Sequence, residues 1–253
     1  MSQPAFNPDD YFTLNRSSHV TVVRLKGDVY SLVTDVVKSD YFIAKINEIN
    51  HTDDIKGLLI LHDKGLFNLA GYRRFMDVII APESMQETWP RFRDPKTRFG
   101  MIHAINRFIR TMVDFKKLFL VGLSGEVVSP FFGISMAADI KYGAEDLSFV
   151  LDHHHYGLHP SGALPYFLTK FLHHSKALEI LLRSEPITAT EALETDLVNK
   201  LLPLEQFEEL CLQHALELCD IRHSTLFYTK RLLNHTRDDL KAYLDYEAQM
   251  INL

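Results

Sequence analysis

The sequence contains few cysteines and no long apolar run, and each absence removes a class of protein. Cys211 and Cys219 are the only two cysteines among 253 residues, too few for a disulfide framework or a thiolate metal site. On one helix they would lie about 12 Å apart along the axis, too far for a disulfide. No stretch approaches the roughly 18 apolar residues of a membrane span, and the N-terminus lacks the basic start and apolar core of a signal peptide. We therefore expect reduced, buried thiols in a cytoplasmic protein without a membrane anchor.

An excess of basic charge is also missing. The formal net charge is −6, which argues against a general nucleic-acid binder because phosphate contacts need a basic face. The sequence contains no phosphate-binding glycine loop, no zinc-protease helix and no nucleophile elbow. What it does contain is a hydrophobic content of 46%, enough for one large domain or two small ones.

Short apolar runs bounded by turn residues predict the strands. A helical pattern separates the first two runs, which predicts a β-α-β unit with a crossover helix. The expected strands are Val20 to Leu25, Gly57 to His62, Leu118 to Leu123, Ile140 to Tyr142, Ser148 to Leu151 and Leu197-Val198.

Helical periodicity and capping signals predict the remaining elements. Apolar residues share one face between Met101 and Met112, and Ser129-Pro130 is expected to cap and open a buried helix that runs through Ala138. Further helices are expected over 176–183 and 189–193, and from Glu205 onward almost throughout. The sequence shows no internal repeat and no linker, so we divide it into an N-terminal arm (1–18), a core (19–200) and a C-terminal helical region (201–253).

The most unusual local composition is the histidine-rich segment HHHYGLHPSGA. In an extended segment, neighbouring side chains point to opposite sides, so at most His153 and His155 would share a face, and we expect no metal site. A single histidine acting as acid or base fits better, because its ordinary pKa lies near neutrality.

Basic residues surround the irregular stretch between residues 81 and 99. They could hold the phosphates of an anionic ligand, but a solvated charged loop is the favoured interpretation because surface charges usually contribute little. The residues concerned are Arg73, Arg74, Arg91, Arg93, Lys96 and Arg98.

The order of these features resembles the crotonase (enoyl-CoA hydratase/isomerase) superfamily. The segment FLHHSKALEILLRSEPITATEALETDLVNKLLP (171–203) is similar to the family's GKALELLLTGEPISAEEALELGLVNKVVP segment. Residues 124–163 resemble its Asn-Gly-x-x-x-Gly-Gly-Gly block and the later Gly-x-x-Pro-x-x-Gly motif. The stretch GLLILHDKGLFNLAGY (57–72) resembles the strand and first active-site loop more loosely. The resemblance implies an α/β fold, a ClpP/crotonase-like spiral of β-β-α units with a helical C-terminal trimerisation region.

The same resemblance implies a pocket for an acyl-CoA thioester, or for the phosphopantetheine thioester of an acyl-carrier protein. The thioester would be the substrate and no separate cofactor is expected. A homotrimer, or a hexamer made of two trimers, is implied, as is a role in fatty acid metabolism. The net charge and the absence of a long apolar run already led us to expect no contact with nucleic acid or membranes.

The resemblance also assigns the site residues. In the family, two backbone N–H groups bind the thioester oxygen as negative charge builds on it. One would come from Gly71 or Tyr72, beside Ala70. The other falls on Pro130, which has no N–H, so the neighbouring Phe131 N–H is the expected donor.

Two glutamates that hydratases of the family use are replaced. Gly133 stands at the first position and His153 at the second, so ordinary hydration is not expected and His153 becomes the expected catalytic base. Expected substrate contacts complete the set: Ala70, Phe132, Gly133, His155 and Gly157.

Three interpretations remain. The favoured one is an isomerase, lyase or decarboxylase that moves a proton on an enolate-forming thioester. The alternative is a non-catalytic homologue that serves as an acyl-CoA-binding or assembly subunit, which the changes at Pro130 and Gly133 would suit. A hydrolase using the histidines lacks an identifiable nucleophile.

Overall fold

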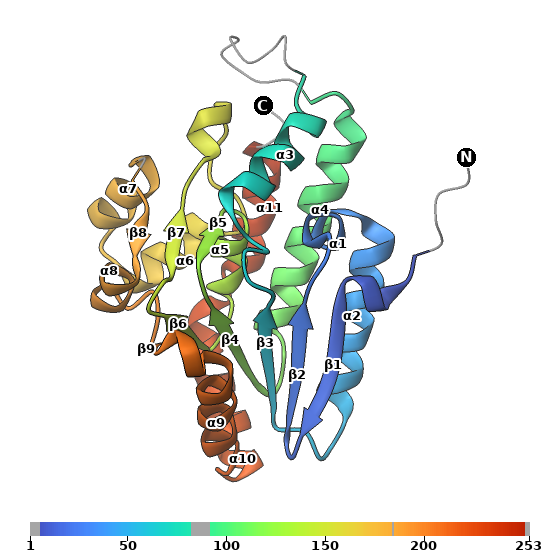
Figure 1. The fold of residues 1–253 in the computed structure, drawn as a ribbon, viewed down its shortest axis with the longest axis vertical. Coiled ribbons are helices and arrows are strands. Elements are labelled where there is room, and N and C mark those ends of the chain that lie inside the picture. The colour runs from blue at the N-terminus through green and yellow to red at the C-terminus, as the bar shows by residue number, and fades with distance from the viewer. Residues whose placement is uncertain (1–5, 82–91, 184, 251–253) are drawn as a thin grey trace.

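The computed structural model describes residues 6–81, 92–183 and 185–250. Its largest element is a six-stranded sheet in the order β1-β2-β3-β4-β6-β9, in which only the edge pair β1 and β2 is antiparallel (Figure 1). Its strands are β1 (Phe12–Ser17), β2 (Val20–Leu25), β3 (Gly57–His62), β4 (Leu118–Leu123), β6 (Ile140–Ala144) and β9 (Lys200–Leu202).

A three-stranded sheet in the order β5-β7-β8 forms a second layer. Its strands are β5 (Glu126–Val128), β7 (Ser148–Val150) and β8 (Ile187–Thr188). β5 follows β4 and β7 follows β6 after short turns, so two successive turns of the chain each give one strand to each sheet. The fold is thus an α/β spiral of β-β-α units with a helical C-terminal region, as the sequence resemblance implies.

Helices cover both faces of the large sheet. Along β3, Leu58 and Ile60 face the main core while Leu59 and Leu61 face a second cluster, because alternate side chains of a strand point to opposite sides. The helices of the first half are α1 (Val29–Thr34), α2 (Val36–His51), α3 (Leu69–Ile79), α4 (Pro95–Val113) and α5 (Phe131–Ser135). Those of the second half are α6 (Leu164–Phe171), α7 (His174–Leu182), α8 (Ala189–Glu194), α9 (Phe207–Cys219), α10 (His223–Asn234) and α11 (Leu240–Met250).

Helix α9 covers the second cluster with Cys211 and Cys219. Both thiols are free and buried, as the sequence predicts, and burial raises the pKa of the Cys211 thiol to about 12. The two cysteines therefore serve as small core residues.

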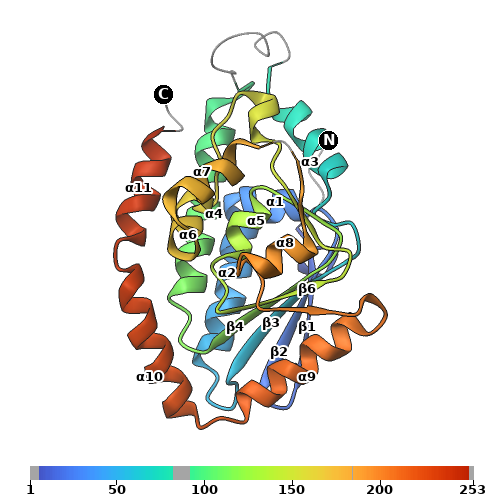
Figure 2. The same ribbon diagram turned by 90° about the vertical axis from the view of Figure 1, so that its left-hand side faces the viewer.

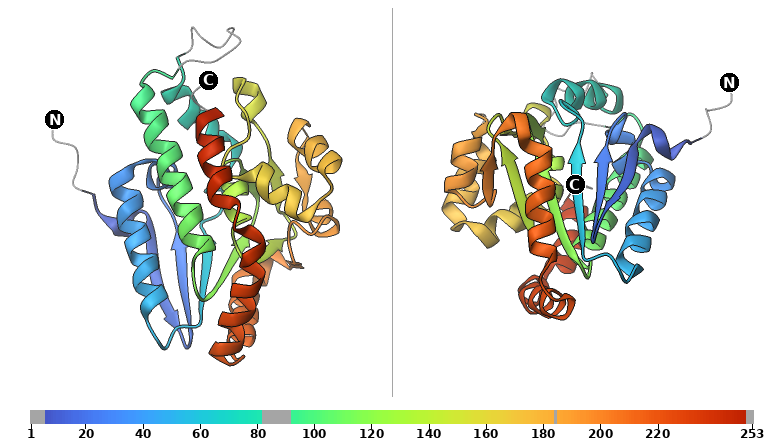
Figure 3. Two further views of the ribbon diagram at one scale, coloured as in Figure 1. Left: turned by 180° about the vertical axis from the view of Figure 1, so that it is seen from behind. Right: turned by 60° about the horizontal axis from the view of Figure 1, so that its bottom comes forward.

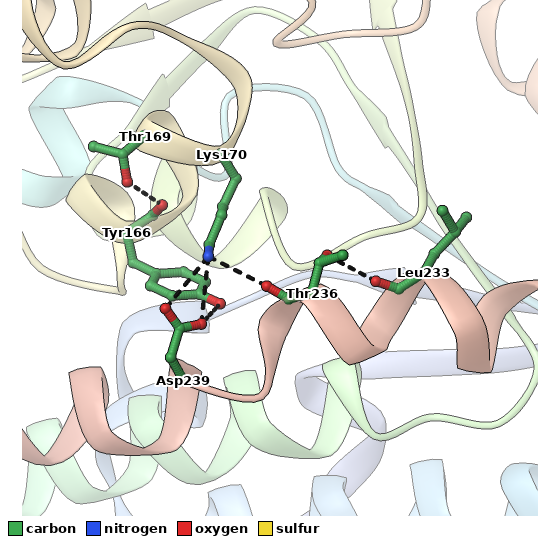
Figure 4. A network of polar contacts seen from close by, with 6 residues as sticks. All are labelled: Tyr166, Thr169, Lys170, Leu233, Thr236 and Asp239. Carbon is green, nitrogen blue, oxygen red and sulfur yellow. Dashed lines mark hydrogen bonds and ion pairs between the residues drawn. The ribbon is translucent and has the colours of Figure 1, made fainter.

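The C-terminal helices return along the molecule, so that α11 lies beside α4 and α6 (Figures 2 and 3). Lys170 on α6 lies between the Asp239 carboxylate and the Thr236 carbonyl, at 3.3 and 3.2 Å, and the Tyr166 hydroxyl donates to Asp239 at 2.7 Å (Figure 4). Further along α11, the backbone carbonyl of Leu244 accepts a hydrogen bond from the Asn106 side chain of α4. These contacts hold the segment from Thr236 to Leu244, which includes the start of α11, against α6 and α4.

The structure corrects several local predictions. Residues 12–17 of the expected N-terminal arm form β1, which pairs with β2 along its full length. The helical pattern after β2 splits at Asp35, which ends α1 and caps α2 by accepting a hydrogen bond from Lys38 N. Leu197-Val198 is not a strand, since the last strand of the large sheet begins at Lys200.

The helix expected from Ser129 to Ala138 is also shorter than predicted. It runs only from Phe131 to Ser135, its N-cap is Pro130 rather than Ser129, and no side chain caps it. None of the described helices combines the length and the apolar character that crossing a bilayer requires.

Candidate active site

A small cavity of about 70 Å³ lies between α3, α4, the start of α5 and the histidine-rich loop. Most of its wall is apolar, which is typical of ligand sites that place a few polar groups among hydrophobic side chains. The apolar lining consists of Tyr72, Met76, Phe92, Met101, Ile102, Ile105, Pro130 and Leu158, and the polar lining of Arg98, His153, His159 and Ser161.

At the start of helix α3, the N-terminal cap uses the backbone N–H groups that the sequence resemblance assigns to the thioester oxygen. Asn68 is the N-cap residue: its side-chain oxygen accepts the Gly71 N–H at 2.7 Å and its carbonyl accepts the Tyr72 N–H at 3.1 Å. The Leu69 N–H donates to a Glu126 carboxylate oxygen at 3.0 Å. The two predicted donors are thus engaged within the chain, and no hydrogen bond from the Ala70 N–H is found among the described residues.

The start of helix α5 is the second region in which the sequence resemblance expects a backbone donor. Pro130 lines the cavity and follows a cis peptide bond after Ser129. The N–H groups of Phe131 and Phe132 find no acceptor in the described part of the chain, which is expected for the first turn of a helix. The Phe132 ring is fully buried against Phe149, with centroids 4.0 Å apart, so its side chain is a core residue rather than a substrate contact.

Gly133 has no room for a side chain. A Cβ atom there would lie 2.5 Å from the Gly162 carbonyl oxygen and 2.8 Å from that of Ser161. A glutamate at this position would require the 161–162 backbone to move. The packing of this loop therefore excludes a side chain at the position where the sequence resemblance expects the first carboxylate.

The histidine-rich segment is a short 3₁₀ helix, η3 (His153–Tyr156), and not the extended segment predicted from the sequence. His153 is buried on the cavity wall, while His154 and His155 are exposed. Gly157 ends the turn in the left-handed conformation, at φ 62°. His153 and His155 consequently do not face one ligand, and no cluster suited to a metal ion occurs among the described residues.

A bidentate ion pair holds η3 against α3. The Arg73 guanidinium donates to both carboxylate oxygens of Asp152, at 3.0 and 2.8 Å, and the Asp152 side chain is almost fully buried. Asp152 immediately precedes His153, so this pair fixes the entry of the histidine loop into the cavity wall. Arg73 thus has a structural partner in the protein instead of a ligand phosphate.

His153 is neutral at physiological pH. Burial, with smaller contributions from His154 and His159, lowers the pKa of its imidazole to about 4. Its Nδ1 atom is buried and has no hydrogen-bond partner in the described part of the protein. Such an orphaned atom on a cavity wall is a candidate for contact with a ligand.

His159 presents a defined tautomer to the same cavity. Its Nδ1 atom lies 2.7 Å from the Pro160 carbonyl oxygen, which can only accept, so Nδ1 carries the proton. In the neutral ring Nε2 is then an acceptor, and this atom is buried without a partner among the described residues. Burial is the main factor that lowers the pKa of His159, and the nearby Arg98 lowers it further.

Arg98, on the first turns of α4, is the third orphaned group. Its Nε atom is buried without a hydrogen-bond partner in the described chain, and its guanidinium lies over the Phe92 ring at 4.4 Å. Burial lowers the pKa of this guanidinium to about 10. The sequence-based interpretation of a solvated charge is wrong for Arg98, since this side chain lines the cavity.

The opposite face of α3 borders a wider, open groove of about 600 Å³. Its lining includes the glycines and polar residues of the loops before α1 and α3, together with outward side chains of α3: Gly27, Lys64, Asn68, Arg74, Phe75 and Val78. Helix α3 thus separates a wide groove that carries exposed cations from a smaller, mainly apolar cavity.

Sequence reasoning located only part of this site. It selected His153 as the base, and this residue lies on the cavity wall. It named His159 only within the histidine-rich segment and Arg98 only among the basic residues that could hold phosphates, and it did not select Ser161. The pattern His-Pro-Ser-Gly at 159–162 offered a signal, because a histidine before a proline in a tight loop is held in one conformation. Residues 82–91, with Arg91, lie outside the described ranges.

The fold matches solved structures of crotonase type over nearly the whole chain. An enoyl-CoA hydratase from Bacillus halodurans superposes with a TM-score of 0.78 at 16% identity, covering 94% of this chain and 92% of that one. An enoyl-CoA hydratase from Polaromonas sp. JS666 gives 0.75 at 17% identity, covering 95% and 90%. At this level of identity the likeness establishes the fold.

Sequence comparison then gives the family. Residues 77–252 match the model of the enoyl-CoA hydratase/isomerase family, so the chain belongs to that family and the predicted crotonase membership is confirmed. Rat enoyl-CoA delta isomerase 2 is 30% identical over an alignment of 120 residues that covers 43% of this chain. The match spans 30% of the rat protein's length.

Proposed function

We propose that this protein binds an acyl-CoA thioester and catalyses proton transfer at the carbon next to the thioester carbonyl, as an isomerase, lyase or decarboxylase does. The observation that carries the proposal is the His159 imidazole, which lines the cavity with an Nε2 acceptor that has no partner among the described residues. A neutral imidazole with a fixed tautomer is suited to accept a proton from carbon.

Hydration is not the favoured reaction. Water addition in this family uses a pair of carboxylates, and the described lining of the cavity contains none. The packing of Gly133 against the 161–162 backbone leaves no space for one at the first position. Proton transfer that uses one imidazole as both acceptor and donor needs no such pair.

The two cavities on either side of α3 fit the two parts of a CoA thioester. The open groove with Lys64 and Arg74 suits the phosphates, because these exposed cations can form charge-assisted hydrogen bonds with them. The small apolar cavity with Met76, Ile105 and Leu158 suits the acyl group.

Two further groups complete the proposed site. The Phe131 N–H is the proposed oxyanion donor, since it finds no acceptor among the described residues. His153 is the second candidate for the proton acceptor, because it lines the same cavity and its imidazole is also neutral.

A non-catalytic acyl-CoA-binding role is the alternative, and the engaged donors of α3 favour it. Because the Gly71 and Tyr72 N–H groups are bonded to Asn68, the first half of the oxyanion site is filled by the protein itself. In this role the cavity would bind the thioester without activating it.

The test is exchange in D₂O of the α-hydrogens of acetyl-CoA and butyryl-CoA, and of the γ-hydrogens of crotonyl-CoA, measured by mass spectrometry. Exchange reports proton abstraction whichever reaction comes next. We expect exchange in the natural protein and a loss of about 10²- to 10⁴-fold in His159→Gln. His174→Gln, an exposed histidine of α7, is the matched control and should retain the full rate.

The outcomes separate the interpretations. A loss in His153→Gln with His159→Gln unaffected would transfer the base role to His153. Saturable binding of the thioesters without any exchange would establish the non-catalytic alternative. Because the pKa of His159 lies below its ordinary value, the exchange rate should hold down to mildly acidic pH and fall only below about pH 6.5, as protonation removes the acceptor.

A further inference from the structure

The cavity wall carries a positive charge that no described carboxylate neutralises. Arg98 lines the cavity, its Nε atom is buried, and no ion pair or hydrogen bond of its side chain occurs within the described residues. A partly buried guanidinium without an anionic partner destabilises the free protein. It is therefore a group that a ligand of suitable charge would satisfy.

The described carboxylates nearby are engaged elsewhere. Asp94, one turn before Arg98, caps α4 by accepting hydrogen bonds from Lys96 N and the Thr97 hydroxyl. Asp152 is held by both arms of Arg73. Neither of these groups is left to pair with Arg98.

Glu247 is likewise occupied. Its oxygens accept the N–H groups of Gly162 and Ala163, each at 3.1 Å. This carboxylate therefore serves the turn that follows Ser161 and does not enter the cavity lining.

The geometry points to an anionic acyl group: the substrate is a thioester whose acyl chain ends in a carboxylate, and Arg98 binds that carboxylate. This inference rests on the proposed thioester-binding function. The planar guanidinium matches a carboxylate with two parallel hydrogen bonds. The Ser161 hydroxyl on the same wall can donate another.

The phosphates of CoA are a poorer match for Arg98. They have the open groove on the other face of α3, where Lys64 and Arg74 are exposed. The Arg98 cavity is smaller and is lined mainly by methionine, isoleucine and aromatic side chains. Its small volume suits the end of a short acyl chain.

The carboxylate is a recognition group in this arrangement. An ion pair with a cation stabilises a carboxylate in its charged form, which opposes its loss as carbon dioxide. Proton transfer near His159 would then occur at the other end of the acyl chain, beside the thioester. Arg98 thus distinguishes a dicarboxylic acyl thioester from a monocarboxylic one of the same length.

The test compares matched thioesters by isothermal titration calorimetry on the full chain. Succinyl-CoA and butyryl-CoA have acyl chains of equal length and differ at the terminal group. We expect the natural protein to bind succinyl-CoA on the order of 10- to 100-fold more tightly, the range of a hydrogen-bonded charged pair. Arg98→Met should abolish this preference and leave butyryl-CoA binding within a few-fold of its natural value.

Lys96→Met removes an exposed cation from the same helix and should keep the preference. Equal or tighter binding of butyryl-CoA by the natural protein would overturn the inference while the thioester function stands, and this comparison needs no variant. Equal weakening of both ligands in Arg98→Met would overturn it too. If free CoA, butyryl-CoA and succinyl-CoA all fail to bind, the proposed function itself falls.

Discussion

The Glu247 carboxylate should make the stability of this protein depend on pH in an unusual direction. Glu247 is 5% exposed, and burial raises the pKa of its side chain from 4.5 to about 7 despite hydrogen bonds from Ala163, Tyr243 and Gly162. The folded state therefore holds the proton more tightly than the unfolded state does. This contribution to stability is complete below about pH 4.5 and is lost as the pH rises through 7.

The magnitude follows from the shift. Raising the pKa from 4.5 to about 7 corresponds to about 3 kcal/mol. Glu247→Gln keeps an oxygen that can accept one N–H but cannot ionise. Relative to this variant, the natural protein should lose about 3 kcal/mol of unfolding free energy between pH 4.5 and 8.

Urea unfolding at a series of pH values measures this difference. Glu194→Gln removes an exposed carboxylate on α8 and should follow the natural protein across the range. The reasoning is refuted if the difference between the natural protein and Glu247→Gln is flat, or if the natural protein gains stability relative to the variant as the pH rises.

Two substitutions test the packing of the site by the same unfolding measurement. Gly133→Ala places a Cβ against the carbonyls of the 161–162 turn and should cost roughly 1–3 kcal/mol. Gly100→Ala in α4, where the nearest atom is 3.9 Å away, should instead be neutral or stabilise by up to about 1 kcal/mol. Arg73→Met leaves the Asp152 carboxylate buried without its partner and should cost about 1–2 kcal/mol, reduced by the partial exposure of Arg73. Arg74→Met, whose side chain faces the open groove, should change stability by less than about 0.5 kcal/mol, and equal costs for the two arginines would contradict the structural role of the pair.

The sequence was most informative where a strand is buried on both faces. β2, β3 and β4 were predicted with the same boundaries as the structure has, because each is a mainly apolar run between turn residues. β1 was missed because its sequence, FTLNRS, is mostly polar and largely exposed. An edge strand of this kind is held by backbone pairing with β2, which leaves no hydrophobic pattern to detect.

The site could be predicted only where one segment carries it. His153 lies in a distinctive sequence and does line the cavity. Arg98 and His159 come from separate elements, and their meeting depends on how α4 packs over the histidine loop. The sequence could not show that Asp94 caps its own helix and leaves Arg98 without it as a partner. The lack of a described partner for Arg98 thus follows from the tertiary structure and could not be predicted from the sequence.

The positions of the described carboxylates explain why none of them lines the cavity. The described carboxylates around the cavity already have partners within the protein. Asp152 pairs with Arg73, and Glu247 accepts the backbone N–H of Gly162. The backbone of the turn at 161–162 packs against Gly133 and leaves no space for a side chain there. The described wall of the cavity is left with two neutral imidazoles and one guanidinium among apolar side chains, so its net charge is positive. This balance supports the proposals of an enolate intermediate and an anionic acyl group, and the described wall offers no carboxylate to activate water.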